Sequence, residues 1–214
     1  MNKFLFRECM NGKSLLRTLQ NLEFSNTELY GKTIDLGSKN GNASYYRFFE
    51  IKSAEITYVD KHYESEDVIN FDLESTIPLI DNQYNNVLSI NLFEHIFNIQ
   101  NLINEIYRIL DVDGKLIGAT PFHKEYHADP YDFYRFTQDF YEKAFSMAGF
   151  KNIKIIPVGI GIFHQIADSL SKIIRFRILK CLIWFLFIKL DKVLSRFYKN
   201  NLNFYSSLVF YCEK

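Results

Sequence analysis

The sequence predicts an α/β protein built on a doubly wound, mostly parallel sheet of seven strands. Short apolar runs with strand character alternate along the chain with longer runs of helical periodicity. The first strand runs into a glycine-containing loop and then into a helical run, which is the first half of a nucleotide-binding βαβ unit. With 214 residues, 48% of them hydrophobic, the chain can fill one well-buried domain over 1–214 but not a second.

The loop after the first strand, 32–36, contains Gly37 and Gly41 and precedes a helical run from Ala43 to Glu50. Gly37 can adopt backbone angles that a side chain forbids, and Gly41 allows a ligand or a helix to approach closely. An ordinary strand-to-helix turn also accommodates glycine, so the loop alone leaves both interpretations open.

The next strand, 56–60, ends in Asp60, which follows the last loop glycine by 19 residues. A bound ribose requires an acid at about this distance, because a carboxylate accepts hydrogen bonds from both vicinal hydroxyls. The alternative for Asp60 is a helix N-cap or a turn residue. The other elements that we expect, in order, are a helix at 13–23, strands at 68–73 and 84–90, a helix at 99–110, a strand at 115–120, a helix at 139–149, and strands at 153–158 and 204–211.

Composition excludes several classes of protein. The formal net charge is zero, which argues against a nucleic-acid-binding surface over the whole protein. The cysteines, Cys9, Cys181 and Cys212, are odd in number and far apart, which favours a reducing, cytoplasmic compartment. No CxxC or clustered His/Cys set is present, so we expect no metal site. Arg7 and Glu8 interrupt the apolar start of the chain, so we expect no signal peptide there.

The segment 159–203 is too long for a hairpin loop and predicts a helical insertion between the sixth and seventh strands. Residues 170–200 have eight basic side chains and one acidic one, a net charge of +7, interleaved with large apolar residues. The uncharged run 181–188 is far shorter than the ~20 residues that span a bilayer. A basic amphipathic helix is typical of binding to a membrane surface, here the inner face. The alternative is a helix pair that packs on its own domain or on a second subunit, as in a homodimer.

Five motifs in order resemble class I S-adenosylmethionine-dependent methyltransferases of the type 11 group. The resemblance covers roughly 30–158 and the last strand, and its motifs lie at 35–41, 59–60, 71–74, 88–95 and 105–116. It implies a seven-stranded sheet whose last strand is antiparallel, with S-adenosylmethionine as cofactor. It also implies the cofactor-binding residues Asp35, Gly37 and Gly41 at the methionine end, Asp60 on the ribose, Asp72 and Leu73 at the adenine, and Asn91 closing the pocket.

One position departs from the family pattern. Lys39 stands where the family usually has a third glycine. A lysine side chain can point outward, but a long cation beside a sulfonium ligand is unfavourable. This departure leaves open a degenerate domain that binds partners or membrane without catalysis.

The segment 121–137 is unusually rich in His, Asp, Tyr and Arg and follows the fifth strand, where ligands bind in such folds. Its pattern is similar to methyltransferases found with bacterial surface-polysaccharide synthesis. O-methylation of a sugar requires a positioned hydroxyl and a base, and histidine has a suitable pKa. The catalytic candidates are His127 first and then His123. The candidate substrate-binding residues are the aromatics Tyr126, Tyr131 and Tyr134, with Asp132 and Arg135.

Alternatives remain for each of these residues and for the acceptor. Each histidine could be a hydrogen-bonded loop residue, and Asp132 and Arg135 could form a salt bridge that shapes the loop. The leading hypothesis is methylation of a saccharide hydroxyl at the membrane. A second is methylation of a small apolar metabolite, such as a quinone or lipid, with the insertion as a lid.

Overall fold

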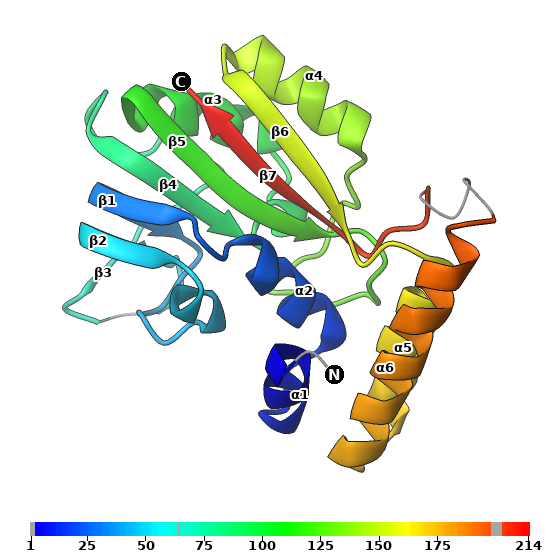
Figure 1. Cartoon of the computed structure of the whole chain (residues 1–214). Helices are drawn as coiled ribbons and strands as arrows, with labels where there is room; N and C mark the ends of the chain where they lie inside the picture. Colours follow the sequence, from blue (N-terminus) through cyan, green and yellow to red (C-terminus); the bar gives the residue numbers. More distant parts are fainter. Residues whose placement is uncertain (1–2, 64, 198–202) are drawn as a thin grey trace.

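The fold is one mixed sheet covered by helices (Figure 1). The structure, a computed structural model, describes residues 3–63, 65–197 and 203–214. Within these residues, seven strands pair in the order β3–β2–β1–β4–β5–β7–β6, and β7 runs antiparallel to both of its neighbours. The predicted fold class, including the antiparallel last strand, is confirmed. Residues 198–202, which include Lys199 of the basic insertion, lie outside the described part.

The elements have the following bounds. The strands are β1 (Glu28–Leu36), β2 (Glu50–Val59), β3 (Val68–Ile69), β4 (Tyr84–Ile90), β5 (Leu110–Pro121), β6 (Lys151–Val158) and β7 (Ser207–Glu213). The α-helices are α1 (Lys3–Met10), α2 (Leu15–Glu23), α3 (Ile99–Ile109), α4 (Gln138–Ala148), α5 (Ile162–Ile173) and α6 (Arg177–Leu194), and the 3-10 helices are η1 (Ser44–Arg47) and η2 (Phe93–His95).

The largest difference from the sequence expectation lies between β1 and β2. The predicted helix from Ala43 to Glu50 is wrong: only the single turn η1 forms, and β2 already begins at Glu50. The run contains four aromatic side chains, which are weaker helix formers than alanine or leucine. Helix α1 was not expected, and β3 is much shorter than the predicted strand 68–73.

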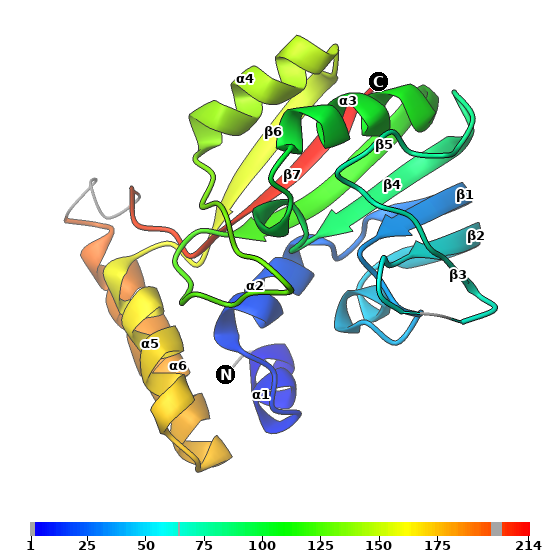
Figure 2. The ribbon, with the colours of Figure 1, turned by 180° about the vertical axis from the view of Figure 1, so that it is seen from behind.

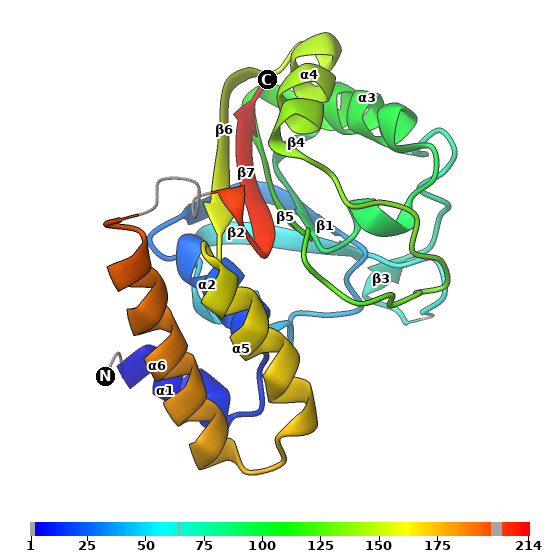
Figure 3. The same ribbon diagram turned by 90° about the vertical axis from the view of Figure 1, so that its right-hand side faces the viewer.

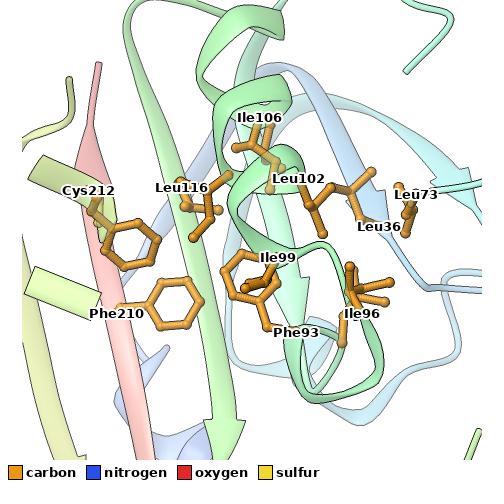
Figure 4. Packing of buried hydrophobic residues seen from close by; sticks show 14 of the residues in the cluster. Leu36, Leu73, Phe93, Ile96, Ile99, Leu102, Ile106, Leu116, Phe210 and Cys212 are labelled. Atoms are coloured by element: carbon orange, nitrogen blue, oxygen red, sulfur yellow. The ribbon is translucent and has the colours of Figure 1, made fainter. Parts of the chain in front are cut away.

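Helices α3 and α4 cover one face of the sheet, and α2 with η1 covers the other (Figure 2). Successive residues of the central strands serve the two faces in turn, as the pleat requires. On β5, Leu116 packs toward α3 (Figure 4). The next residue, Ile117, packs into the opposite core. Full burial of each such side chain stabilises the fold by about 1.5–3 kcal/mol.

Helices α5 and α6 form an antiparallel pair that projects beyond the edge where the parallel strands end (Figure 3). The predicted helical insertion is confirmed, and we call this pair the arm. Its buried side, with Cys181 and Trp184, packs with Cys9 and Leu15 from the N-terminal helices. No helix in the described part of the chain is long and apolar enough to cross a membrane.

Candidate active site

The sheet order changes direction at β1, which lies between β2 and β4. In open α/β sheets the crevice beyond the carboxyl ends of strands at such a point is where ligands bind. Gly37 follows β1 and has a φ of +76°, and a Cβ atom there would lie 2.9 Å from Leu92 Cδ1. Its amide and that of Ser38 both donate to the carbonyl of Val59, at 2.8 and 2.9 Å. The turn therefore requires glycine and is fixed to the end of β2.

A cleft opens at this point, which we call the first cleft. It brings together six of the residues predicted from the sequence: Gly37, Asp60, Asp72, Leu73, Asn91 and Tyr131. Its other lining residues are Lys39, Lys61, His62, Glu74, Leu92, His95, Ile96, Asp129 and Pro130.

The two predicted carboxylates of the first cleft are held by local contacts. Asp60 Oδ1 accepts from the amide of His62 at 2.8 Å. Asp72 accepts from Lys61 Nζ at 2.6 Å and from the amide of Glu74 at 3.0 Å. The lysine contact is the main reason why the pKa of Asp72 lies below its ordinary value. Asp72 therefore stays ionised at the edge of the cleft.

Asn91 follows β4 with a left-handed φ of 54°. Its side-chain amide pairs with that of Gln20, with the two hydrogen bonds 2.9 and 3.1 Å long. Gln20 is fully buried on α2 and also donates to Ser207 Oγ at 2.7 Å. Helix α2 thus fixes the orientation of Asn91 in the cleft.

Asp35 and Gly41 are not brought to the first cleft. Asp35 is 1% exposed, and its Oδ2 accepts from the hydroxyls of Tyr45 and Tyr46 at 2.6 and 2.5 Å. Burial raises the pKa of Asp35 to about 6. A Cβ atom on Gly41 would lie 2.7 Å from the hydroxyl of Tyr58, so this glycine gives room to a packed tyrosine.

A second cleft adjoins the first and shares Asn91, His95 and Asp129 with it. Its further lining residues are Ser14, Leu16, Arg17, Pro121, Lys124, His127 and Ala128. It therefore lies between the start of α2 and the loop that follows β5. His127, the first catalytic candidate, lines this cleft.

Two imidazoles converge on one buried carboxylate below the second cleft. Nε2 of His127 and Nε2 of His95 lie 3.6 and 3.7 Å from Glu94 Oε1. The other ring nitrogen of each histidine faces a backbone carbonyl oxygen. His95 Nδ1 lies 2.5 Å from the carbonyl oxygen of Tyr131, and His127 Nδ1 lies 3.1 Å from that of Glu125. Because a carbonyl only accepts, we assign the ring proton to Nδ1 in both histidines. Each Nε2 then faces Glu94.

Glu94 is fully buried, and neither carboxylate oxygen has a hydrogen-bond partner in the described part of the chain. Its carboxylate is the largest cause of a pKa of His127 above the ordinary value. One ligand atom from each of Glu94, His95 and His127 lies within 4.8 Å of the others, so the group could hold a metal ion. The same distances suit imidazole–carboxylate ion pairs, so the geometry requires no metal.

The loop that carries His127 is held by the salt bridge expected as the structural alternative for Asp132 and Arg135. Arg135 contacts both oxygens of Asp132, at 2.5 and 2.8 Å, and also donates to the carbonyl of Tyr134 at 2.7 Å. Asp132 accepts from the amide of His127 at 2.9 Å, and the guanidinium keeps the pKa of Asp132 well below its usual range. The Asp132–Arg135 pair therefore fixes the position of the His127 backbone.

Three other predicted residues do not line either cleft. Tyr134 donates to the carbonyl of Phe97 at 3.0 Å, and Tyr126 is 75% exposed. His123 lies on the far side of the loop, beside Ile162 and other residues of α5. The structure separates His123 from His127.

The sequence reasoning missed three residues of the second cleft and its floor: Arg17, Glu94 and Lys124. For Glu94 a signal was present, because it closely follows a buried strand that borders the switch point. No such sequence signal was present for Arg17, since it lies inside an ordinary amphipathic helix.

Comparisons with known proteins agree with this geometry. Residues 31–118 match the family model described as a methyltransferase domain. A search of curated proteins found no match. A SAM-dependent methyltransferase from Archaeoglobus fulgidus is similar in structure, with 16% identity, a TM-score of 0.55 and 100% of each chain covered.

Two further structures share the fold. Phosphoethanolamine N-methyltransferase 2 of Haemonchus contortus, in complex with S-adenosyl-L-methionine, has 14% identity and a TM-score of 0.54, with 91% of this chain and 52% of that chain covered. The [4+2]-cyclase SpnF has 14% identity and a TM-score of 0.57, with 98% and 80% covered. The domain match and the fold together indicate a class I, S-adenosylmethionine-dependent methyltransferase.

The residues of the first cleft fit this cofactor. S-adenosylmethionine carries a sulfonium, an ammonium and a carboxylate, and thus a net positive charge. The cleft is lined by four acids (Asp60, Asp72, Glu74 and Asp129) against two lysines, an acidic excess of two with the histidines neutral. Lys39 lines the cleft, but this acidic excess outweighs it.

Proposed function

We propose that the protein O-methylates a saccharide hydroxyl of a bacterial surface glycan at the membrane, with S-adenosylmethionine as methyl donor. The observation that carries this proposal is the adjacency of the two clefts, which share Asn91, His95 and Asp129. The cofactor supplies a methyl group activated on a sulfonium. The second cleft can hold an acceptor beside it.

The residues of the first cleft have separate roles in this proposal. Asp60 accepts hydrogen bonds from the ribose hydroxyls, and Leu73 packs beside the adenine. Gly37 and Asn91 bound the methionine end of the site. Most of the rate acceleration comes from holding the two reactants in line.

His127 is the proposed general base. Its Nε2 accepts the hydroxyl proton as the oxygen–methyl bond forms and the carbon–sulfur bond breaks, leaving S-adenosylhomocysteine. The Glu94 carboxylate, 3.6 Å from Nε2, stabilises the imidazolium that results. Asp132 fixes the backbone of the base through the His127 amide, at 2.9 Å.

The saccharide acceptor is supported by the polar, aromatic loop around the clefts. Tyr131 lines the first cleft and is 60% exposed, so its ring is available to stack on a sugar face. A quinone or lipid acceptor is less well supported, because Arg17, Lys124 and His127 line the second cleft. The acidic excess of the first cleft counters the effect of Lys39, on which the non-catalytic alternative rests.

Membrane contact is supported by the surface of the arm. Four apolar residues at intervals of three or four, Leu182, Leu186, Leu190 and Val193, form a stripe on α6 and are 37–61% exposed. Lys189, Lys192 and Arg196 are exposed along the same helix and the turn after it. Cationic residues near anionic lipid contribute about 1 kcal/mol each. This arrangement favours an anionic membrane surface and a lipid-linked acceptor.

Transfer of labelled methyl groups tests the catalytic proposal. With a saccharide-containing cell-envelope extract as acceptor, His127→Ala is expected to lower turnover by about 10²–10⁴-fold, because a general base is lost. Its affinity for S-adenosylhomocysteine, measured by calorimetry, should be unchanged. His123→Ala is the matched control and should retain full turnover. Equal turnover of the wild type and His127→Ala would remove this residue from the mechanism.

Flotation with liposomes tests the membrane proposal. Wild-type protein should float with vesicles that contain phosphatidylglycerol, and less with neutral phosphatidylcholine vesicles. Replacing Leu182 and Leu186 with serine should abolish flotation without changing methyl transfer to a water-soluble acceptor. Recovery of all the wild-type protein in the vesicle-free fraction, together with a dimeric mass in sedimentation, would assign the stripe to a homodimer instead.

A further inference from the structure

The second cleft is lined by a cation that forms no salt bridge among the described residues. Arg17 lies in the first turn of α2, lines the cleft and is only partly exposed. Among the described residues, none accepts a hydrogen bond from its guanidinium or pairs with it as a carboxylate within 4.0 Å. Burial lowers the pKa of Arg17 below its ordinary value, and the charge of the nearby Glu94 carboxylate only partly opposes this effect.

In two other partly buried arginines of the chain, acids and backbone carbonyls compensate the charge of the guanidinium. Arg108 donates to Glu105 and Asp81 and to two backbone carbonyls, at 2.6–3.0 Å. Arg135 contacts both oxygens of Asp132 and the carbonyl of Tyr134, at 2.5–2.8 Å. Arg17 makes no comparable set of contacts.

The position of Arg17 adds a second local penalty. A positive charge in the first turn of a helix opposes the helix dipole, which favours anions there. A partly buried cation without an acceptor is also destabilising. The Glu94 carboxylate attracts this charge without contacting it, and a bound anion would give the guanidinium the direct acceptor that it lacks among the described residues.

The surroundings of Arg17 match an anion rather than a neutral ligand. Lys124 lines the same cleft, and its Nζ lies 3.2 Å from Glu125 Oε1 at the protein surface. Arg17 and Lys124 line the cleft with one acid, Asp129, and the buried carboxylate of Glu94 lies below it, so the charges of the second cleft balance, in contrast to the acidic excess of the first cleft. The second cleft therefore lacks the acidic excess of the first, and its two lining cations are available to an anionic acceptor beside the cationic donor.

We infer that the acceptor is an acidic saccharide whose carboxylate or phosphate group is bound by Arg17 in the second cleft. This inference rests on the proposed function and deepens it. The planar guanidinium donates two parallel hydrogen bonds to such an oxyanion. The anion then anchors the sugar while a hydroxyl elsewhere on the ring meets His127. Lys124 adds a positive charge to the cleft without fixing the orientation of the anion.

Ligand-observed NMR in the presence of saturating S-adenosylhomocysteine tests the inference with D-glucuronate, D-glucose 6-phosphate and neutral D-glucose. The wild type is expected to bind at least one of the two anions about 10–100-fold more tightly than glucose. A preference for glucuronate identifies a carboxylate-bearing acceptor, and a preference for the phosphate identifies a phosphorylated one. Equal binding of all three sugars, or binding of none, would overturn the inference.

The variants separate a ligand-binding arginine from a structural one. Arg17→Gln should lose the preference for anions. Arg17→Lys should retain only part of it, because lysine cannot donate the two parallel hydrogen bonds of a guanidinium. Arg7→Gln, an exposed arginine on α1 outside both clefts, should behave as wild type. The melting temperature of ligand-free Arg17→Gln should equal or exceed that of the wild type. A clear decrease, with anion binding retained, would make Arg17 a structural residue.

Failure of the inference can be distinguished from failure of the proposed function. Calorimetry with S-adenosylhomocysteine reports on the first cleft alone. If this ligand does not bind while Arg17-dependent anion binding persists, the methyltransferase proposal fails and the anion site stands. If it binds and all variants treat the three sugars alike, only the inference about the acceptor fails.

Discussion

Asp35 offers a direct test of how the end of β1 is built. Its carboxyl group is 1% exposed, and its raised pKa of about 6 means that the folded state favours the protonated form. Asp35→Asn removes this titration with little change of shape. The amide oxygen can take the place of Oδ2 below Tyr45 and Tyr46, and the amide nitrogen takes the place of Oδ1, which has no partner within the described residues.

The size of the expected stability difference follows from the pKa shift of Asp35. Each unit of pKa difference between the folded and unfolded states corresponds to about 1.4 kcal/mol. A folded pKa of about 6 against a reference value of 3.8 gives a free energy of about 3 kcal/mol. Because the folded state binds the proton more tightly, the wild type loses this stability as the pH rises from 3.8 through 6. Above pH 6 the loss is complete.

Urea unfolding followed by circular dichroism measures this effect. At pH 7.5, Asp35→Asn should be more stable than the wild type by up to about 3 kcal/mol, and at pH 4.5 the difference should fall to about 1 kcal/mol. Tyr46→Phe is the control, because it removes a donor to the ionised carboxylate and should destabilise more at pH 7.5 than at pH 4.5. A constant difference between Asp35→Asn and the wild type from pH 4.5 to 7.5 would refute the reasoning.

Three further predictions concern the cofactor, the arm and metal dependence. Asp60→Asn should weaken binding of S-adenosylhomocysteine by about 10–100-fold in calorimetry, because hydrogen bonds to a charged acceptor are lost; an unchanged affinity would remove Asp60 from the ribose site. Asp191→Ala should destabilise the protein by about 3 kcal/mol in urea unfolding. The reason is that Asp191 accepts hydrogen bonds from the amides of His164 and Phe163, at 2.7 and 3.1 Å. Lys192→Ala is the control and should have little effect. Dialysis against EDTA should leave methyl transfer unchanged, because Glu94 acts directly on His127 by stabilising the imidazolium that forms in the reaction; a loss of activity restored by a divalent cation would assign a metal to them instead.

The arm depends on a contact that no sequence pattern indicated. Asp191, near the end of α6, lies at the start of α5, where a Cβ atom on Gly161 would lie 2.2 Å from its carboxyl carbon. The same carboxylate lies 2.6 Å from His164 Nδ1. Basic and apolar periodicity predicted helices in this segment, but only packing shows that Asp191 joins the two helices.

The sequence by itself determined the fold class and the location of the first cleft. Alternating apolar runs specify strands and helices through local periodicity, and Gly37, Asp60 and Asn91 each follow a strand. The carboxyl ends of parallel strands share one edge, so residues at such positions meet without further information. Local patterns were also where the prediction failed, since the helix expected after Gly41 is a single turn that brings Tyr45 and Tyr46 to Asp35.

Only the tertiary structure decided the chemistry of the second cleft. Arg17, Glu94 and His127 come from α2, from η2 and from the loop after β5. Even the closest two, Glu94 and His127, are 33 positions apart along the chain. Whether an arginine has an acceptor, or a carboxylate is buried, depends on which segments pack against it. Burial and pairing are properties of the assembled core, because desolvation and charge interactions act between residues that are close in space but distant in sequence.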